Sequence, residues 1–373
     1  MELPREVTNS FESDLVEALQ PIRGYVLASV LYAFFQSGLY NELSERPSGC
    51  PADLAAQLSL DPSRTVAVLK YLRNEGYLLE RSGQFSLSHR SELLSYYQPW
   101  YTMLIGGYSA TFNGILEQLR SPSQYAIRDA AMVGIGSCGI SHFDAIPLFR
   151  ALLESMDREC RRVVDLGCGD ALCLIELCTT WKDVEAWGVE PDERAFAHGR
   201  EAIRQAGLEN RIQLVCADAI EFLSAPSAFE PDCFLFGFML QELLEQVGED
   251  AALGILRTIG EKFPDAYLSV IEVDYQIDSP IMRSHQLGIS YYNPYFLIHA
   301  VTQQRLERAE YWRNFFRKGG YDIVTESHPS CLVDSTGLEI GFLLKQNTIN
   351  VGRVKQCRVL DDVPQEFSGI GNS

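Results

Sequence analysis

The chain has 373 residues, of which 46% are apolar and 22% are charged, and its formal net charge is −19 at neutral pH. This length indicates two domains of ordinary size, and the apolar content excludes an intrinsically disordered chain. A surface this acidic repels phosphate backbones, so we expect no nucleic-acid partner, whereas small neutral or cationic ligands stay open.

Neither a membrane span nor a secretion signal is predicted. The longest apolar run, residues 25–35, is about half as long as a transmembrane helix. The stretch MELPREVTNSFESD lacks the positive-then-apolar order of a signal peptide. The ten cysteines form no CxxC pair, and we interpret them as buried thiols. We therefore expect a cytoplasmic protein.

Residues 1–98 are predicted to form a helical winged-helix domain. Residues 14–40 show a helical pattern whose apolar positions cover most of the circumference, more than one core-facing stripe requires. Such a helix is either buried inside its own domain or shared with a second subunit, and we favour the second. Two further helices, over 52–60 and 62–78, precede two short strands around Ser82 and Gly83.

This module is open to two interpretations. In a transcription regulator, the helix over 62–78 would enter the major groove of DNA. Its cations are only Arg64, Lys70 and Arg73, on a chain that is acidic as a whole. We therefore expect a scaffold that forms a homodimer. Residues 99–153 follow as a connector rich in glycine, serine and aromatic residues, of the kind that forms the wall of a site.

Residues 154–346 alternate between strand and helix patterns. Short apolar runs typical of buried parallel strands occur at 161–167, 185–190, 212–218, 232–238 and 266–274. Helical segments follow the first four runs, and a last helix is expected over 302–321. Residues 322–328 and 337–345 then close the sheet as an antiparallel pair. This order predicts an α/β domain with a Rossmann-like doubly wound sheet.

The first strand of this domain leads into a glycine turn, VVDLGCGDA. Asp165 ends the strand, and Gly167 and Gly169 allow the backbone to approach a ligand closely. The third glycine of a dinucleotide motif is missing, because Leu172 stands three residues after Gly169. An acid in this place suits a cationic methionine group better than a pyrophosphate.

Two more acids follow the next two strands. Glu190 can accept both hydroxyls of a ribose, and Asp218, followed by Ala219, can accept an adenine amino group. Because ligands of open α/β sheets bind at the carboxyl ends of the strands, we expect Asp165, Glu190 and Asp218 to meet at one crevice. Each acid taken singly is also typical of a helix cap or a solvated turn.

At these residues the sequence resembles the class I S-adenosylmethionine-dependent methyltransferases, whose motifs are D/E-x-G-x-G followed by an acid after each of the next two strands. With its N-terminal module the chain resembles the small-molecule O-methyltransferases, which are commonly dimers. The resemblance extends to about Gln346, and Ala171 replaces a frequent glycine. Residues 347–373 have no counterpart and are expected to be a mobile tail.

The acceptor residues depart from the O-methyltransferase pattern. A histidine base usually follows the fourth strand in that family, whereas this chain has Gln241 and Glu242 there. His285 and His299 remain as substitutes for the base. A closer similarity is to the 2-oxo acid C-methyltransferases, the group that includes the phenylpyruvate and 2-ketoarginine enzymes.

That similarity implies a set of acceptor residues. It makes Arg128 the ligand of the substrate carboxylate and Trp100 an aromatic wall. It also places the stretch containing Tyr292, Asn293 and His299 over the site. A plain surface ion pair between Arg128 and the adjacent Asp129 is the alternative reading of this arginine.

The resemblance also bears on metal. Two histidines hold iron in the phenylpyruvate enzyme, and the matching residues here are Gln241 and Asn293, neither of which carries an imidazole. We therefore assign no metal ligands, although a weak oxygen–nitrogen site stays open.

These matches suggest a mechanism for C-methylation at the β-carbon of a 2-oxo acid such as 2-ketoarginine. Arg128 would bind the carboxylate, and Glu242 would remove the β-proton. Gln241, together with Asn293, would donate to the enolate oxygen. The alternatives are an O- or N-methyltransferase of a small aromatic metabolite, a regulator with a relic cofactor domain, and a nicotinamide-dependent dehydrogenase.

Overall fold

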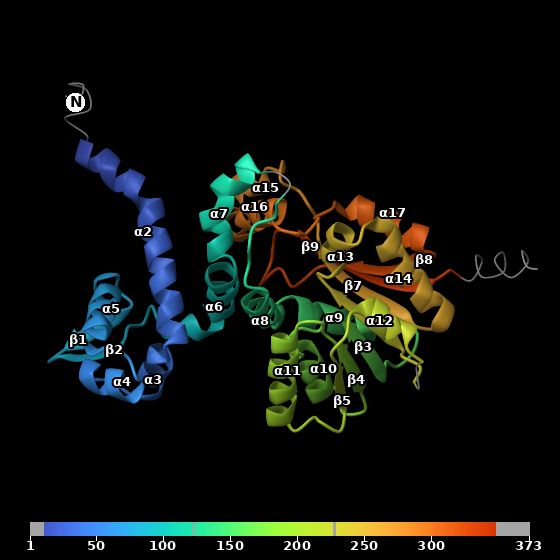
Figure 1. The fold of residues 1–373 in the computed structure, drawn as a ribbon, viewed down its shortest axis with the longest axis horizontal. Coiled ribbons are helices and arrows are strands. Elements are labelled where there is room, and N and C mark those ends of the chain that lie inside the picture. Colours follow the sequence, from blue (N-terminus) through green and yellow to red (C-terminus); the bar gives the residue numbers. More distant parts are fainter. Residues whose placement is uncertain (1–10, 122–123, 227–228, 348–373) are drawn as a thin grey trace, which may run out of the picture.

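The computed structural model describes residues 11–121, 124–226 and 229–347. Figure 1 shows them as an N-terminal module, a group of helices in the middle, and an α/β domain that holds the large sheet. The tail predicted for 347–373 lies outside the described residues, except for Asn347.

The N-terminal module has the predicted winged-helix elements. They are α2 (Phe11–Gln36), α3 (Leu39–Glu45), α4 (Pro51–Gln57), α5 (Pro62–Asn74), β1 (Leu78–Arg81) and β2 (Gln84–Leu87). Asp61 caps α5, because its Oδ1 accepts a hydrogen bond of 2.8 Å from the Arg64 N–H. β1 and β2 form an antiparallel hairpin around Ser82 and Gly83, as predicted.

Helix α2 is buried only toward its C-terminal end. Leu31, Phe34 and Phe35 pack into the core of the module. Seven large apolar side chains in the first part of the helix are exposed: Phe11, Leu15, Val16, Leu19, Ile22, Tyr25 and Val26. The first part of α2 is therefore not buried inside its own domain, which was one of the two predicted alternatives. By length and hydropathy α2 would suffice to cross a membrane, a test that core helices of soluble proteins also pass.

The connector expected over 99–153 is mostly helical. It comprises the end of α6 (Leu94–Tyr101), a π-helical segment η1 (Thr102–Gly107), α7 (Ser109–Arg120), α8 (Ala130–Ser141) and most of α9 (Ala145–Glu154). α8 packs closely against η1 at Gly136, where a Cβ would lie 2.4 Å from the Met103 backbone nitrogen. Only glycine permits this approach, which fixes the position of α8.

The large sheet has seven strands in the order β5-β4-β3-β6-β7-β9-β8. The strands are β3 (Arg162–Leu166), β4 (Glu185–Val189), β5 (Ile212–Val215), β6 (Cys233–Gly237), β7 (Tyr267–Val273), β8 (Tyr321–Ser327) and β9 (Glu339–Gln346). β3 to β7 are parallel, and β9 joins antiparallel to β7 and β8, as predicted. The order reverses between β3 and β6, which opens a crevice at the carboxyl ends of these strands.

Helices cover both faces of this sheet (Figure 1). The helical segments of this domain are α10 (Leu172–Thr180), α11 (Glu193–Ala206), α12 (Ala219–Ser224), α13 (Leu240–Gln246), α14 (Glu249–Lys262), α15 (Ile281–Ser284), α16 (Asn293–Val301), α17 (Ala309–Gly319) and a π-helical segment η2 (Gly288–Tyr292). Of these, α15, α16 and η2 pack together beside α7 and not on the sheet. One core cluster joins the sheet to α14 and α17, and a second joins it to α9 and α10. The predicted doubly wound fold is confirmed.

The start of the last helix was predicted wrongly. The last helix was expected to begin at Thr302, whereas α17 begins at Ala309. The intervening residues bond to the site instead, since the Arg305 N–H donates to the Gln241 carbonyl at 2.8 Å. Asp274 then holds the start of α17, because its Oδ1 accepts a bond of 2.8 Å from the Ala309 N–H.

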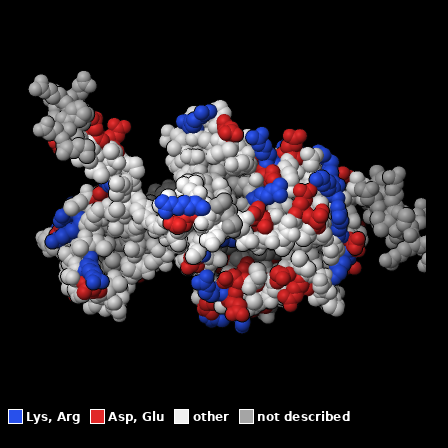
Figure 2. Space-filling view, turned by 45° about the horizontal axis from the view of Figure 1, so that its top comes forward, with Lys and Arg blue, Asp and Glu red and all other residues white. Residues whose placement is uncertain are grey.

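Charge is distributed differently over the parts of the molecule. On the face in Figure 2, acidic and basic side chains are interspersed over the α/β domain, whereas the surface around α2 and the middle helices is mostly uncharged. A row of lysine and arginine side chains follows one edge of the α/β domain on this face, with acidic side chains beside it.

Candidate active site

The glycine turn joins β3 to α10 and is tied to the neighbouring strand β4. The N–H groups of Gly167 and Cys168 both donate to the Val189 carbonyl, at 2.8 and 3.1 Å. Gly167 and Gly169 have φ angles of 79° and 56°. Ala171, in place of the frequent glycine, also has a positive φ, of 63°.

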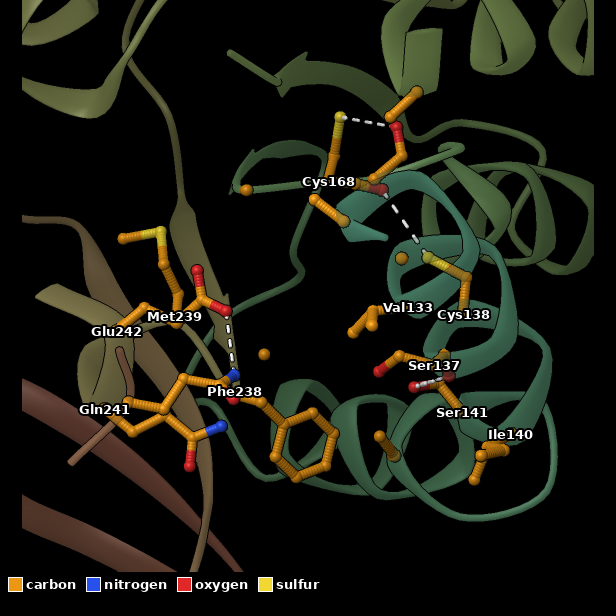
Figure 3. Close-up of a pocket in the computed structure, with 18 of the residues that line it drawn as sticks. Val133, Ser137, Cys138, Ile140, Ser141, Cys168, Phe238, Met239, Gln241 and Glu242 are labelled. Atoms are coloured by element: carbon orange, nitrogen blue, oxygen red, sulfur yellow. Dashed lines mark hydrogen bonds between the residues drawn. The ribbon is translucent and has the colours of Figure 1, made fainter. Parts of the chain in front are cut away.

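Helix α8 closes over this turn. A Cβ at Gly169 would lie 2.7 Å from Cys138 Sγ on α8, so a side chain there would push the helix away. Figure 3 shows Val133, Ser137 and Cys138 of α8 on one side of a pocket, with the segment from Phe238 to Glu242 on the other. The turn, α8 and this segment therefore form the walls of one cavity.

Two of the predicted acids are buried at this turn. Glu190 is 8% exposed, and its carboxylate accepts from the N–H groups of Gly169 and Asp192, both at 2.9 Å. Asp165 is 5% exposed. Burial raises the pKa of Asp165 to about 7, and the neighbouring Glu190 adds to this shift. Burial also raises the pKa of Glu190. This end of the cavity therefore favours a ligand that brings positive charge.

The third acid lies at the rim of the same cavity. Asp218 is exposed and caps α12, because its Oδ1 accepts a bond of 2.8 Å from the Glu221 N–H. Asp165, Glu190, Asp218 and Ala219 all line a cavity of about 440 Å³. The expected convergence of the three acids is therefore present, and it leaves the second oxygen of Asp218 without a capping bond.

The acceptor side of this cavity contains a charged pair that the sequence did not predict. Arg128 Nη2 donates to Glu242 Oε1 at 2.9 Å, and Gln304 Nε2 donates to the same oxygen at 2.9 Å. The alternative pairing of Arg128 with Asp129 is wrong, since Asp129 pairs with Arg194 at 3.4 Å. Arg128 Nη1 is buried without a hydrogen-bond partner. A free guanidinium donor therefore lines the cavity.

Gln241 is buried beside a neutral histidine. Its Nε2 lies 3.3 Å from the Tyr295 hydroxyl and 3.4 Å from His299 Nε2, and its Oε1 has no partner. Burial lowers the pKa of His299 to about 3, so the imidazole is neutral. Because His299 Nδ1 donates to the Tyr295 carbonyl at 2.7 Å, its Nε2 carries the lone pair.

Several predicted residues lie elsewhere. Asn293 is exposed at the start of α16 and does not line the cavity, so its predicted contact with the acceptor is wrong. Trp100 packs on Phe143, with ring centroids 5.7 Å apart, and is also outside the cavity lining. His285 contacts Ser335 instead. Tyr292 lines the cavity as expected.

Other residues of the cavity were missed. Tyr108 follows η1, Gln304 precedes α17, and Asp144 and Glu339 begin α9 and β9. The sequence did single out Glu339, because it is the only acid in the mostly apolar run GLEIGFLLK. Nothing in the sequence pointed to Gln304 as a cavity residue, because it lies within a stretch that was predicted to be helical.

The three acids and the glycine turn suit S-adenosylmethionine as the ligand of this cavity. Asp165 can accept from its ammonium group, Glu190 from the ribose hydroxyls, and Asp218 from the adenine amino group. Gly167 and Gly169 leave room for the ligand against the turn. For metal, the described histidine, cysteine, aspartate and glutamate side chains form no group of three that could hold an ion.

Comparisons with known proteins agree with this geometry. Residues 163–259 match the family model of a methyltransferase domain. The chain is 41% identical over 336 residues to 2-ketoarginine methyltransferase of Streptomyces arginensis, covering 90% of this chain and 96% of that protein. The solved structure of N,N-8-amino-8-demethyl-D-riboflavin dimethyltransferase (RosA) from Streptomyces davawensis has a TM-score of 0.61 at 16% identity, over 89% of this chain and 99% of that one.

The solved structure of PigF with SAH also has a similar fold, with a TM-score of 0.60 at 17% identity, over 89% of this chain and 99% of that one. These two structures share the fold, and the relative from Streptomyces arginensis shares much of the sequence. The match to a methyltransferase over nearly the whole chain replaces the alternatives of a dehydrogenase and of a regulator. The chain belongs to the S-adenosylmethionine-dependent methyltransferases of class I fold.

Proposed function

We propose that the enzyme methylates the β-carbon of a 2-oxo acid. The observation that carries this proposal is the buried Nη1 of Arg128, which has no partner and lines the same cavity as the cofactor acids. A buried guanidinium donor without an acceptor is costly, and a substrate carboxylate would satisfy it. The 2-ketoarginine methyltransferase at 41% identity supports an acceptor of this class.

Arg128 and Glu242 share the work of binding the substrate and removing its proton. Arg128 donates through Nη1 to the substrate carboxylate, while Glu242 holds Nη2 and so fixes the direction of the guanidinium. Glu242 Oε1 is occupied by Arg128 and Gln304, whereas Oε2 has only a contact of 3.5 Å with Gln246. Oε2 is therefore the atom that accepts the β-proton.

Gln241 stabilises the enolate that this proton transfer leaves. Its side chain is 1% exposed, and its Nε2 lies 3.3 Å from the Tyr295 hydroxyl and 3.4 Å from His299 Nε2. One Nε2 hydrogen leaves such a long contact when the substrate is bound and donates to the developing oxygen. Asn293 plays no part in this step, because its side chain is exposed. S-adenosylmethionine supplies the methyl group when bound.

A second candidate is O- or N-methylation of a small aromatic compound. It is favoured by His299, whose Nε2 lone pair faces Gln241 among the tyrosines of the cavity and is placed to accept a phenolic proton. Against it, the low pKa of His299, about 3, makes this imidazole a weak base in the unliganded protein.

An assay with labelled methyl donor separates the two candidates. Purified full-length enzyme is offered aliphatic 2-oxo acids, phenols and aromatic amines, and NMR of the product locates the new methyl group. We expect a C-methyl group on the β-carbon. We also expect Arg128→Ala to lower kcat/KM for the oxo acid by about 100-fold, the size of a lost charge-assisted pair. A methylated phenol, or full activity of Arg128→Ala, would refute the proposal.

We further propose that residues 1–98 form a homodimer through α2, that 99–153 line the site, and that 154–346 bind the cofactor. The exposed apolar side chains of α2, among them Ile22 at 60% exposure, support a partner helix. All nine described cysteines are free, in accord with a cytoplasmic enzyme.

The dimer is tested by sedimentation velocity. Ile22→Asp places a charge in the apolar surface and should yield monomers, whereas Glu17→Gln on the same helix should leave the dimer intact. A wild-type monomer at micromolar concentration would contradict this proposal.

A further inference from the structure

Three carboxyl groups gather in a part of the cavity that the mechanism above does not use. Asp144 caps α9, Glu339 is the first residue of β9, and Asp334 lies in the loop before β9. They are 8%, 3% and 6% exposed, respectively. Asp144 and Glu339 line the cavity itself. The fold thus brings acids from three segments to one buried place.

The hydrogen bonds of these acids are incomplete in one respect. Asp334 is fully bonded, because its oxygens accept from the Tyr292 hydroxyl at 2.5 Å and from Thr336 N–H and Oγ1 at 2.8 and 2.6 Å. Asp144 accepts from the Ala145 N–H at 2.6 Å. Glu339 Oε1 is buried without any partner. One carboxylate oxygen in the cavity lining therefore lacks a donor.

The cluster also lacks a positive charge. Among the described residues, no lysine, arginine or histidine forms an ion pair with Asp144, Asp334 or Glu339. Burial raises the pKa of Asp144 to about 7, and Asp334 adds to the shift. Burial, reinforced by Asp144 and Asp334, raises the pKa of Glu339 well above its usual range. A cation in the cavity would relieve this repulsion.

The surrounding side chains suit an organic cation. Tyr291, Tyr292 and Tyr295 line the same cavity, and aromatic faces attract guanidinium and ammonium groups. The Tyr295 hydroxyl accepts a hydrogen bond of 3.3 Å from Gln241 Nε2 in the same cavity. A planar guanidinium matches carboxylates through parallel hydrogen bonds.

From this arrangement we propose that Asp144 and Glu339 bind the guanidinium group at the end of the substrate side chain, while Arg128 binds the carboxylate at its other end. This inference rests on the proposed 2-oxo acid function and narrows it to cationic substrates. It makes Glu339 Oε1 a specificity determinant, because only a substrate with a terminal donor can satisfy it.

Two substrates of nearly equal shape test the proposal. In 2-oxo-5-ureidopentanoate a carbonyl oxygen replaces one NH₂ group of the guanidinium of 5-guanidino-2-oxopentanoate, so the side chain is neutral and one donor becomes an acceptor. We expect wild-type enzyme to prefer the guanidino acid at least about tenfold in kcat/KM, as for a charge-assisted bond. Glu339→Gln should reduce this preference to within about twofold. Glu185→Gln, an exposed glutamate that also begins a strand, should keep the wild-type preference.

The outcomes separate the two proposals. Equal use of both substrates by wild type, or full preference in Glu339→Gln, would overturn the guanidinium site while 2-oxo acid methylation stands. If wild type methylates neither of these two but does methylate another 2-oxo acid, the guanidinium site is overturned, and if it methylates no 2-oxo acid at all, the proposed function fails as well.

A binding measurement on wild type alone does not depend on how a variant folds. Calorimetry with butylguanidinium should show binding that butylurea lacks, and absence of such binding would overturn the site.

Discussion

The two ends of the cavity are built in different ways. At the cofactor end, Asp165, Glu190 and Asp218 lie in or just after the carboxyl ends of three strands of one parallel sheet, so neighbouring strands bring them together. At the acceptor end, Arg128 precedes α8 and Glu242 lies on α13, and only the packing of helices brings them within 2.9 Å. The arrangement of residues at the cofactor end follows from the sheet itself. The arrangement at the acceptor end depends on how the helices pack on the sheet.

The largest expected effect is at the acceptor end. Glu242→Gln keeps the size of the side chain and removes the base, so kcat should fall by ~100- to 10,000-fold, the usual contribution of a general base. Deuterium exchange at the β-carbon, followed by NMR in the presence of S-adenosylhomocysteine, should fall in parallel.

Glu245→Gln, the same change at a residue of α13 that does not line the cavity, is the control variant and should exchange as the wild type does. If Glu242→Gln lost methyl transfer while exchange continued at the wild-type rate, another group would be the base and Glu242 would only position Arg128.

The next largest effect is at the cofactor end. Glu190→Ala removes the carboxylate that holds the Gly169 N–H and that would bind the ribose. Loss of these charge-assisted bonds should weaken S-adenosylhomocysteine binding by about 100-fold in calorimetry. Glu185→Ala, at the opposite end of the same strand, should bind as the wild type does. If Glu190→Ala bound S-adenosylhomocysteine as tightly as the wild type does, Glu190 would not be the residue that binds the ribose.

The same contrast explains what the sequence predicted. The strands themselves, the glycine turn and the three acids are encoded in short segments, and the fold contains all of them. Trp100 and Asn293 were assigned to the acceptor end by resemblance, but the packing of α6 and α16 directs them away from it. Gln304 was missed because its stretch bonds to Gln241 instead of continuing as a helix. Contacts of this kind depend on tertiary structure that no local pattern specifies.

A smaller effect tests the docking of α8. Gly136→Ala would place a Cβ 2.4 Å from the Met103 backbone, so the helix must shift, at a cost of about 1–3 kcal/mol of unfolding free energy. Gly134→Ala on the same helix has no atom within 4 Å of its Cβ. It should stabilise the protein by about 0.5–1 kcal/mol through helix propensity. Urea unfolding of both variants checks this, and equal stabilities would show that α8 is not held at Gly136.

The smallest effect is the pH dependence of cofactor binding. The pKa of Asp165 in the unliganded protein is about 7, so its carboxyl is ionised above pH 7 and protonated below it. A ligand ammonium group favours the ionised form, and below pH 7 binding must release a proton. The affinity for S-adenosylhomocysteine should therefore be level above pH 7 and fall by at most about tenfold per pH unit below it. Adenosine, which lacks the amino acid, should show a shallower slope in the same calorimetric series. Equal slopes for the two ligands would mean that Asp165 does not meet the ammonium group, and the acid before the glycine turn would then need another role.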